Sequence, residues 1–516
     1  MAFIYRPTSL LPRLRNFTLA RPACAALKTS VRLQETNTTT ASKDQVKSYN
    51  EIPGSGTLKS LYNFLLKDGI SRIHLNQEES RDRYGPICRE ILGPFKTVYV
   101  FDPDVVQQVF QNEGEYPARE PSSPIWQMYK KDRGQSEGVL TLHGEKWYKA
   151  RSALSKKMLK PKVVSEYAPE LTGVMQDFVG RVMELRESSQ DKTVPNLQNE
   201  LFKWSLESIG TVLFEKRFGS FEKPPSKEAQ RFINAARTVF STLFELFLYP
   251  EWMAKVYKTK RLRAFYDAMD VMYDFGDALV QEKIIEIAEK AKDIDKDKGA
   301  EFLTFIVASK KLSSKEITAN LVEILMAAVD TTSNTSLWTM YNLAKNPEVQ
   351  ERLHKEVTSV LKPGEIATPS TINKMHYLKA CVKETLRLVP VAIENARIFD
   401  RDVPIMGYNI PKHVMVRIPI YAMGRDANLF DDPLSYKPER WLRGDKSHPH
   451  YHPFSSLPFG YGVRMCLGRR VAEMEMYLLL SRIMQLFQLE SMNDVEPMTR
   501  GLLVPDKDVF IKFNQR

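Results

Sequence analysis

The sequence predicts a mainly α-helical protein with a smaller β portion. From about residue 103 to residue 390, apolar residues recur with helical periodicity. A short β-branched run from Lys96 to Phe101 precedes that stretch, and strand-like, turn-rich sequence follows Pro390. No internal repeat is evident, and 43% of the 516 residues are hydrophobic. The chain is therefore expected to bury a large core, although its length alone would favour two or three domains.

The basic character of the chain is concentrated at its N-terminus. Six of the 74 basic residues precede Glu35, where there are no acids, so the rest of a chain with net charge +11 carries only +5. These are Arg6, Arg13, Arg15, Arg21, Lys28 and Arg32. An Arg-rich, Ser/Thr-bearing, acid-free start is typical of a mitochondrial transit peptide, and it lacks the run of ~18 apolar residues that a membrane anchor needs. We expect residues 1–40 to be the transit peptide and the start of a linker; a disordered tail is the alternative. The charge distribution gives no reason to expect a nucleic-acid partner.

Residues 41–102 lead from the linker into the fold. The stretch from Glu35 to Asn50 is polar, and Ile52, Pro53 and Gly54 open the folded part. Asp102 and Pro103 mark the turn from the first strands into helix. Four cysteines match neither a zinc site nor a disulfide framework, which fits a reducing compartment.

Two features lie in the first half of the helical region. Trp147 and Arg151 are four residues apart in GEKWYKAR and share one face of a helix, which is usually a surface pair. A helical run from Arg231 to Trp252 ends in the apolar FSTLFELFLYP. It is too short and too interrupted to span a membrane, so core packing is its simplest interpretation.

The longest predicted helix begins with a capping box, Ser313 with Glu316, and continues to Asn346 before Pro347. At 1.5 Å per residue it would extend ~50 Å, enough to cross a whole domain. Its middle carries Asp330, Thr331 and Thr332, whose side chains compete for backbone hydrogen bonds and are expected to open the helical ladder. A hydrogen-bonded Ser/Thr patch inside a core is the alternative.

The next helix carries Glu384 and Arg387 three residues apart, and KPERW further on supplies Arg440. One acid and two arginines can form a network of bidentate hydrogen bonds that tolerates burial. Alone, an ExxR pair is weak evidence, because it is common on any helix surface.

A glycine-rich stretch from Phe459 to Arg470 reads FGYGVRMCLGRR. Its glycines allow positive φ and a close approach to a flat ligand. Cys466 lies just before a predicted helix start, where backbone N–H groups favour a thiolate, and thiolates are good axial ligands for haem iron. The alternative is a glycine-rich turn around a structural cysteine.

This stretch resembles the cysteine loop of the cytochrome P450 superfamily, with Phe459, Gly462, Arg464, Cys466 and Gly468 in the family's positions. ExxR, PERW and the cysteine loop also follow one another in the family's order. The resemblance covers roughly residues 52–513. It implies the cytochrome P450 fold over one haem-thiolate monooxygenase domain, residues 41–516, with haem b (iron protoporphyrin IX) between the long central helix and the cysteine-loop helix and Cys466 as its metal ligand.

The resemblance also implies a role for each motif. Trp147, Arg151, Arg397 and Arg464 would surround the haem propionates. Asp330 and Thr331 would manage protons, whereas Glu384, Arg387 and Arg440 would hold the cysteine loop. Ala328 stands where the family usually has Gly. The apolar run would roof the pocket with Leu243, Phe244, Phe247 and Leu248, and the region of Trp252 would touch a membrane.

Further residues resemble the mitochondrial class of the family, which docks an adrenodoxin-type ferredoxin on basic side chains. Lys379 and Lys383 lie four apart, and Arg469 and Arg470 follow the cysteine loop. Solvated surface charge is the alternative. The segments FEKRFG, VDTTSNT and LLVP are most similar to the sterol 27-hydroxylase and vitamin D hydroxylase group. Ile393 and Ala396 depart from that group in a strand that lines its substrate pocket.

The expected function is therefore hydroxylation of an apolar sterol, steroid or secosteroid with O₂. Electrons would pass from NADPH through a reductase and a ferredoxin, at the matrix side of the mitochondrial inner membrane, where the protein would be peripheral. Two alternatives are a haem-thiolate isomerase or dehydratase, which needs no external electrons, and a non-enzymatic haem- or sterol-binding protein. Neither alternative needs Thr331, and neither needs the basic pairs.

Overall fold

The structure is a computed structural model that describes residues 46–66, 69–93, 95–119, 123–246, 249, 251–289, 302–443 and 450–516. The chain from Val46 to Arg516 forms one compact unit. The expected transit peptide and the expected pocket residues Phe247 and Leu248 lie outside the described residues.

Helices make up most of the described residues, which confirms the predicted fold class. Their bounds are α1 (Thr57–Leu66), α2 (Ile73–Tyr84), α3 (Pro103–Gln111), α4 (Pro124–Arg133), α5 (Gly144–Met158), α6 (Pro161–Glu166), α7 (Ala168–Ser188), α8 (Leu197–Phe214), α9 (Lys227–Glu245), α10 (Glu251–Val256), α11 (Lys260–Glu289), α12 (Phe302–Ala308), α13 (Ser314–Lys345), α14 (Pro347–Val360), α15 (Pro369–Ile372), α16 (His376–Leu388), α17 (Ile420–Gly424) and α18 (Arg469–Leu486). Within the described ranges, no helix is both long and apolar enough to cross a membrane.

In the part of the chain that the structure describes, the β portion consists of one five-stranded sheet, ordered β1-β2-β3-β7-β4, and three two-stranded sheets, β5-β6, β8-β11 and β9-β10. The strands are β1 (Gly54–Ser55), β2 (Ile87–Leu92), β3 (Phe95–Val100), β4 (Asn395–Ile398), β5 (Val403–Ile405), β6 (Tyr408–Ile410), β7 (Met415–Ile418), β8 (Phe487–Ser491), β9 (Pro497–Arg500), β10 (Leu502–Pro505) and β11 (Ile511–Gln515). The parallel pairing of β3 with β7 joins the N-terminal strands to those that follow Pro390.

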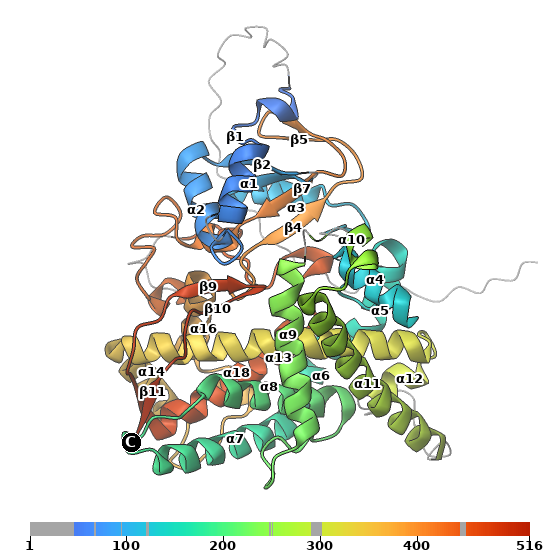
Figure 1. Ribbon diagram of the computed structural model, residues 1–516. Helices are drawn as coiled ribbons and strands as arrows, with labels where there is room; N and C mark the ends of the chain where they lie inside the picture. The colour runs from blue at the N-terminus through green and yellow to red at the C-terminus, as the bar shows by residue number, and fades with distance from the viewer. Residues whose placement is uncertain are drawn as a thin grey trace, which may run out of the picture. The chain divides into compact units, whose positions relative to one another are not determined.

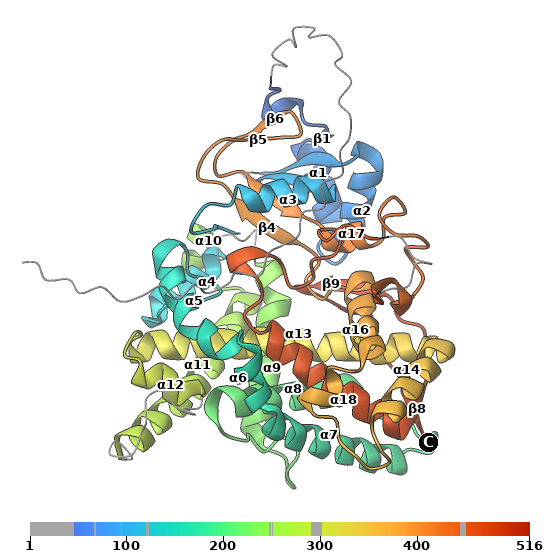
Figure 2. The same cartoon turned by 180° about the vertical axis from the view of Figure 1, so that it is seen from behind.

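Helix α13 runs through the helical region, whereas α1, α2, α3 and α17 lie by the five-stranded sheet (Figures 1 and 2). It begins with the predicted capping box, in which Ser313 and Glu316 bond reciprocally, and Asn346 caps its other end. It packs against α8, α11, α16 and α18, so it is buried over most of its length. The predicted central helix is confirmed with the predicted ends.

The buried apolar side chains of the described residues form two cores. The larger is built around α13 and the helices that touch it. The smaller lies between the five-stranded sheet and α3, whose first turn is capped by Asp102. Figure 2 shows the segment that leads into α18 between α13 and the sheet. The fold thus places Cys466 where the helical and sheet regions meet.

Candidate functional site

The cysteine loop is a tight turn held by its own backbone. The Cys466 N–H donates to the Phe459 carbonyl at 2.8 Å. Gly460 and Gly462 have φ of +69° and +73°, a region that side chains rarely adopt. A Cβ at position 462 would also lie 2.6 Å from Glu113 Oε1. Gly468, in contrast, has an ordinary φ of −83°, so the turn requires glycine at the first two positions only.

The surroundings of Cys466 have opposing effects on the pKa of its thiol. Burial raises the pKa of the Cys466 thiol, whereas the backbone N–H groups of Gly468 and Arg469 and the charge of Arg151 lower it. Helix α18 begins directly after Gly468, so these N–H groups are those of a helix start. Although neighbouring atoms crowd the thiol, Cys466 keeps exposed surface. A thiol in this position is available as a ligand.

All four predicted propionate residues lie beside the loop, where Arg397 donates to the Tyr461 carbonyl at 3.1 Å. The Arg464 guanidinium lies 3.6 Å from the centre of the Trp147 ring. Arg151 reaches from α5 to the Met465 carbonyl at 2.5 Å. Arg397 approaches the same region but is paired with Glu113 at 2.5 Å, an acid that the sequence did not single out.

This cluster carries an excess of buried positive charge, which a negatively charged ligand would stabilise. Burial and the neighbouring charges of Arg119, Arg397 and Arg151 lower the pKa of Arg464 to about 9, and Glu113 is the acid that opposes them. Burial also lowers the pKa of Arg151 to about 10. Arg119, likewise missed by the sequence analysis, donates to the Leu140 carbonyl. Four clustered cations with one carboxylate fit a ligand that carries two carboxylates, as haem does, next to its thiolate ligand.

Asp330 and Thr331 lie side by side on α13. Asp330 is 5% exposed, and its Oδ2 has no hydrogen-bond partner among the described residues. Burial raises the pKa of Asp330 to about 7, although the charge of Arg237 lowers it. The Thr331 hydroxyl donates to the Ala327 carbonyl at 2.8 Å. Because α13 is continuous from Ser314 to Lys345, the expected opening of the helical ladder is wrong.

The predicted network around Glu384 is present and buried. Arg387 forms two hydrogen bonds to the Glu384 carboxylate, at 2.9 and 2.6 Å, and Arg440 adds one at 3.2 Å. All three side chains are at most 1% exposed. Trp441, which was not predicted, donates a further bond. The two arginines also bind carbonyls between Gly424 and Ser435, so the network fixes the segment that precedes the cysteine loop.

The four basic residues expected to bind a ferredoxin also come together. Glu473 lies among them and pairs with Arg469 at 3.0 Å and with Arg470 at 3.8 Å. The charge of Glu473 also acts to raise the pKa of Lys379 and Lys383, against the effect of burial. Lys383 and Arg470 are exposed. We call these four basic side chains the basic patch. Because it contains the first residues of α18, it adjoins the cysteine loop.

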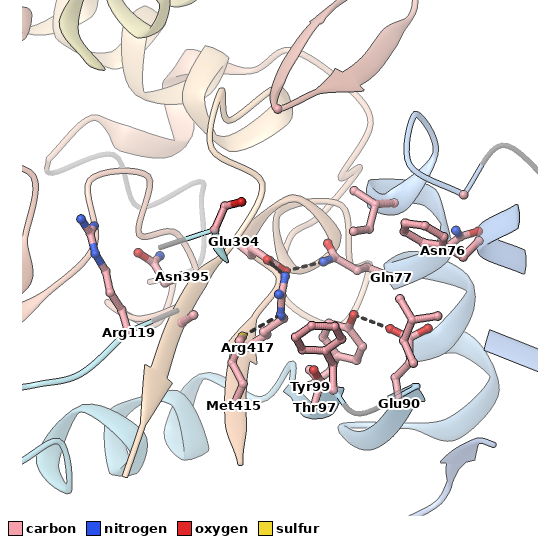
Figure 3. A pocket seen from close by; sticks show the side chains of 18 of the residues that line it. Asn76, Gln77, Glu90, Thr97, Tyr99, Arg119, Glu394, Asn395, Met415 and Arg417 are labelled. Atoms are coloured by element: carbon pink, nitrogen blue, oxygen red, sulfur yellow. Dashed lines mark hydrogen bonds and ion pairs between the residues drawn. The ribbon is translucent and has the colours of Figure 1, made fainter. Parts of the chain in front are cut away.

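A cavity of about 480 Å³ extends from the arginine cluster (Figure 3). Arg119, Arg397 and Arg464 line one part of it. Leu243, one of the residues expected to roof a pocket, also lines it, together with Phe240. A volume of this size is usual for a small-molecule site, although Cys466, Asp330 and Thr331 are not among the residues that line it.

Comparisons with known proteins agree with this geometry. The family model described as "Cytochrome P450" matches residues 53–513. The chain is 35% identical to the mitochondrial sterol 26-hydroxylase of Rattus norvegicus, over 92% of this chain and 90% of that protein. It is 36% identical to the mitochondrial 25-hydroxyvitamin D-1 alpha hydroxylase of Mus musculus, over 92% and 94%. It is 37% identical to cytochrome P450 10 of Lymnaea stagnalis, over 93% and 89%.

Proposed function

Because the chain belongs to the cytochrome P450 family and is a monooxygenase of that family, we propose that it hydroxylates a sterol, steroid or secosteroid in mitochondria with electrons from a ferredoxin. The observation that carries the ferredoxin is the convergence of the basic patch beside the Cys466 loop. An acidic electron carrier would be steered to this surface by charge. The similarity to mitochondrial sterol and vitamin D hydroxylases supports the substrate class.

The chain's own residues would divide the work as follows. Haem b held by Cys466 would supply the activation of O₂. Trp147, Arg151, Arg397 and Arg464 would hold the propionates, with Arg397 exchanging its bond to Glu113 for one to a propionate. Because burial raises the pKa of Asp330 to about 7, its carboxyl would hold a proton below that pH and could release it towards the reaction. The Thr331 hydroxyl, one residue on, would pass that proton when it turns from the Ala327 carbonyl.

The same proposal accounts for two exposed apolar groups. Trp252 and Val256 on α10 are 66% and 83% exposed, and Leu58 on α1 is 86% exposed. Apolar side chains of this size favour the boundary of a lipid bilayer. We therefore propose that these helices contact the matrix side of the inner membrane peripherally. Residues 1–40 would act as the transit peptide that directs import, and residues 41–516 would form a single domain.

Reconstitution tests this function. The purified holoenzyme is supplied with NADPH, an adrenodoxin-type ferredoxin and its reductase, and is incubated with a panel of sterols, steroids and secosteroids. We expect a product heavier by one oxygen atom with at least one of them. A parallel reaction in which a microsomal two-flavin reductase replaces the ferredoxin pair should give little product. Equal turnover in both reactions would contradict the ferredoxin assignment.

A further inference from the structure

A second acidic residue is buried on α13, closer to the start of the helix than Asp330. Glu323 is 1% exposed, and its Oε1 lies 2.6 Å from the ammonium group of Lys130 on α4, which is buried as well. The Thr141 hydroxyl accepts from the same ammonium and donates to the same carboxylate. Burying an ion pair is costly unless its remaining hydrogen bonds are made, so the other partners of Glu323 show what it holds.

These partners come from residues 138–142, between α4 and α5, which we call the bridge loop. The N–H groups of Gly138 and Leu140 donate to the two oxygens of Glu323, at 3.0 and 2.7 Å. The Val139 N–H donates to Asn320 on the same helix. A Cβ at Gly138 would lie 2.6 Å from the Glu323 carboxylate, so glycine permits this close approach. The bridge loop is thus fastened to α13 by its N–H groups.

The carbonyl groups of the bridge loop hold two members of the arginine cluster. Arg119 donates to the Leu140 carbonyl at 2.9 Å. Both terminal nitrogens of Arg464 donate to the Leu142 carbonyl at 3.4 Å. Leu140 and Thr141 also line the cavity. A displacement of the bridge loop would therefore move Arg119 and Arg464 together.

We propose that Glu323 is a positioning residue, which fixes the bridge loop so that Arg119 and Arg464 are in place for the propionates of the bound haem. This inference rests on the proposed function, in which Arg464 holds a propionate. Glu323 acts through the bridge loop, because its oxygens are occupied by Lys130, Thr141 and the backbone N–H groups. A carboxylate suits this place, since every one of these partners is a donor.

Glu323→Gln tests the proposal, because the side chain keeps its shape while its NH₂ group meets donors. Two properties of the substrate-free holoenzyme are measured: the rate of haem release to excess apomyoglobin and the reduction potential of the haem. We expect haem release to be about tenfold faster. The potential should be lower, because displaced cations no longer stabilise the added electron. The sign is diagnostic, since loss of the negative charge of Glu323 by itself would raise the potential.

Glu207→Gln is the matched control. Glu207 is buried on α8 and likewise accepts from two backbone N–H groups, those of Phe218 and Ser220, and from Arg217. These residues do not line the cavity. The variant should therefore lose stability, as any disrupted buried carboxylate does, but keep the wild-type rate of haem release and the wild-type potential.

Gly138→Ala is a second variant, for the case in which Glu323→Gln does not hold haem. Its methyl group forces the bridge loop away from α13 but leaves both charges of the ion pair in place. We expect faster haem release and a lower potential here too.

Arg464→Leu separates the two ways in which the proposal can fail. If Arg464→Leu releases haem faster while Glu323→Gln and Gly138→Ala match the wild type, Glu323 has no positioning role and the proposed function stands. A higher potential in Glu323→Gln, or an equal change in Glu207→Gln, also overturns the positioning role. If Arg464→Leu itself matches the wild type, Arg464 does not hold a propionate, and both assignments are wrong.

Discussion

Asp330 and Thr331 are neighbours on α13 with different environments. The Thr331 hydroxyl is bonded to its own helix and must turn to serve a proton relay. Thr331→Ala should leave substrate binding unchanged but lower the product formed per NADPH consumed by about tenfold or more. Thr335→Ala is the matched control, because the Thr335 hydroxyl makes the same kind of bond to the Thr331 carbonyl. If wild type and Thr331→Ala formed the same amount of product per NADPH consumed, Thr331 would have no part in the proton relay.

The raised pKa of Asp330 predicts a pH dependence. A carboxyl with a pKa near 7 is protonated below that pH and loses its proton as the pH rises through 7. If Asp330 donates protons, the rate of product formation should fall as the pH rises through 7. Asp330→Asn should have a lower rate without this step. A wild-type rate that increases across the same interval would contradict the assignment.

Site residues that belong to a motif with fixed spacing could be predicted from the sequence, whereas site residues that lie on loops could not. Trp147 and Arg464 come from motifs, and the structure stacks one upon the other. Glu113 and Arg119 lie between α3 and α4, where no periodicity or motif marks them. Glu323 lies within the predicted central helix, but its contacts with residues 138–142 depend on tertiary structure.

At the scale of the element, the network on α16 makes the firmest prediction. Arg387→Leu would leave Glu384 buried without its main partner, which costs ~3–5 kcal/mol for a buried pair. The urea midpoint of the holoenzyme should fall accordingly, with loss of haem. Lys345→Ala breaks an exposed ion pair with Asp494 and should leave the midpoint nearly unchanged. Similar midpoints for both variants would show that the network is not structural.

Elements were predictable where their signals are local. The capping box at Ser313 and the stop before Pro347 define α13 in the sequence and in the structure. The run from Lys96 to Phe101 appears as β3. The parallel pairing of β3 with β7 was not predictable, because it joins segments some three hundred residues apart and depends on the packing of everything between them.

At the scale of the whole molecule, the basic patch should act through its charge. Replacing Arg469 and Arg470 by Gln should weaken ferredoxin binding at low ionic strength, with a smaller effect at high salt. Titrations at two salt concentrations measure this. The same change at the exposed Lys311 and Lys315 should have little effect. A loss that is equal at both salt concentrations would indicate altered folding rather than altered charge.

The central claim is that this cytochrome P450 uses ferredoxin electrons to insert one oxygen atom of O₂ into a sterol-type substrate. Turnover under ¹⁸O₂ with NADPH, ferredoxin and its reductase tests it most directly, with the product analysed by mass spectrometry. The account predicts a product that carries one ¹⁸O atom and forms only when ferredoxin is present. An isomerised or dehydrated product without ¹⁸O, formed equally well without ferredoxin, would contradict it.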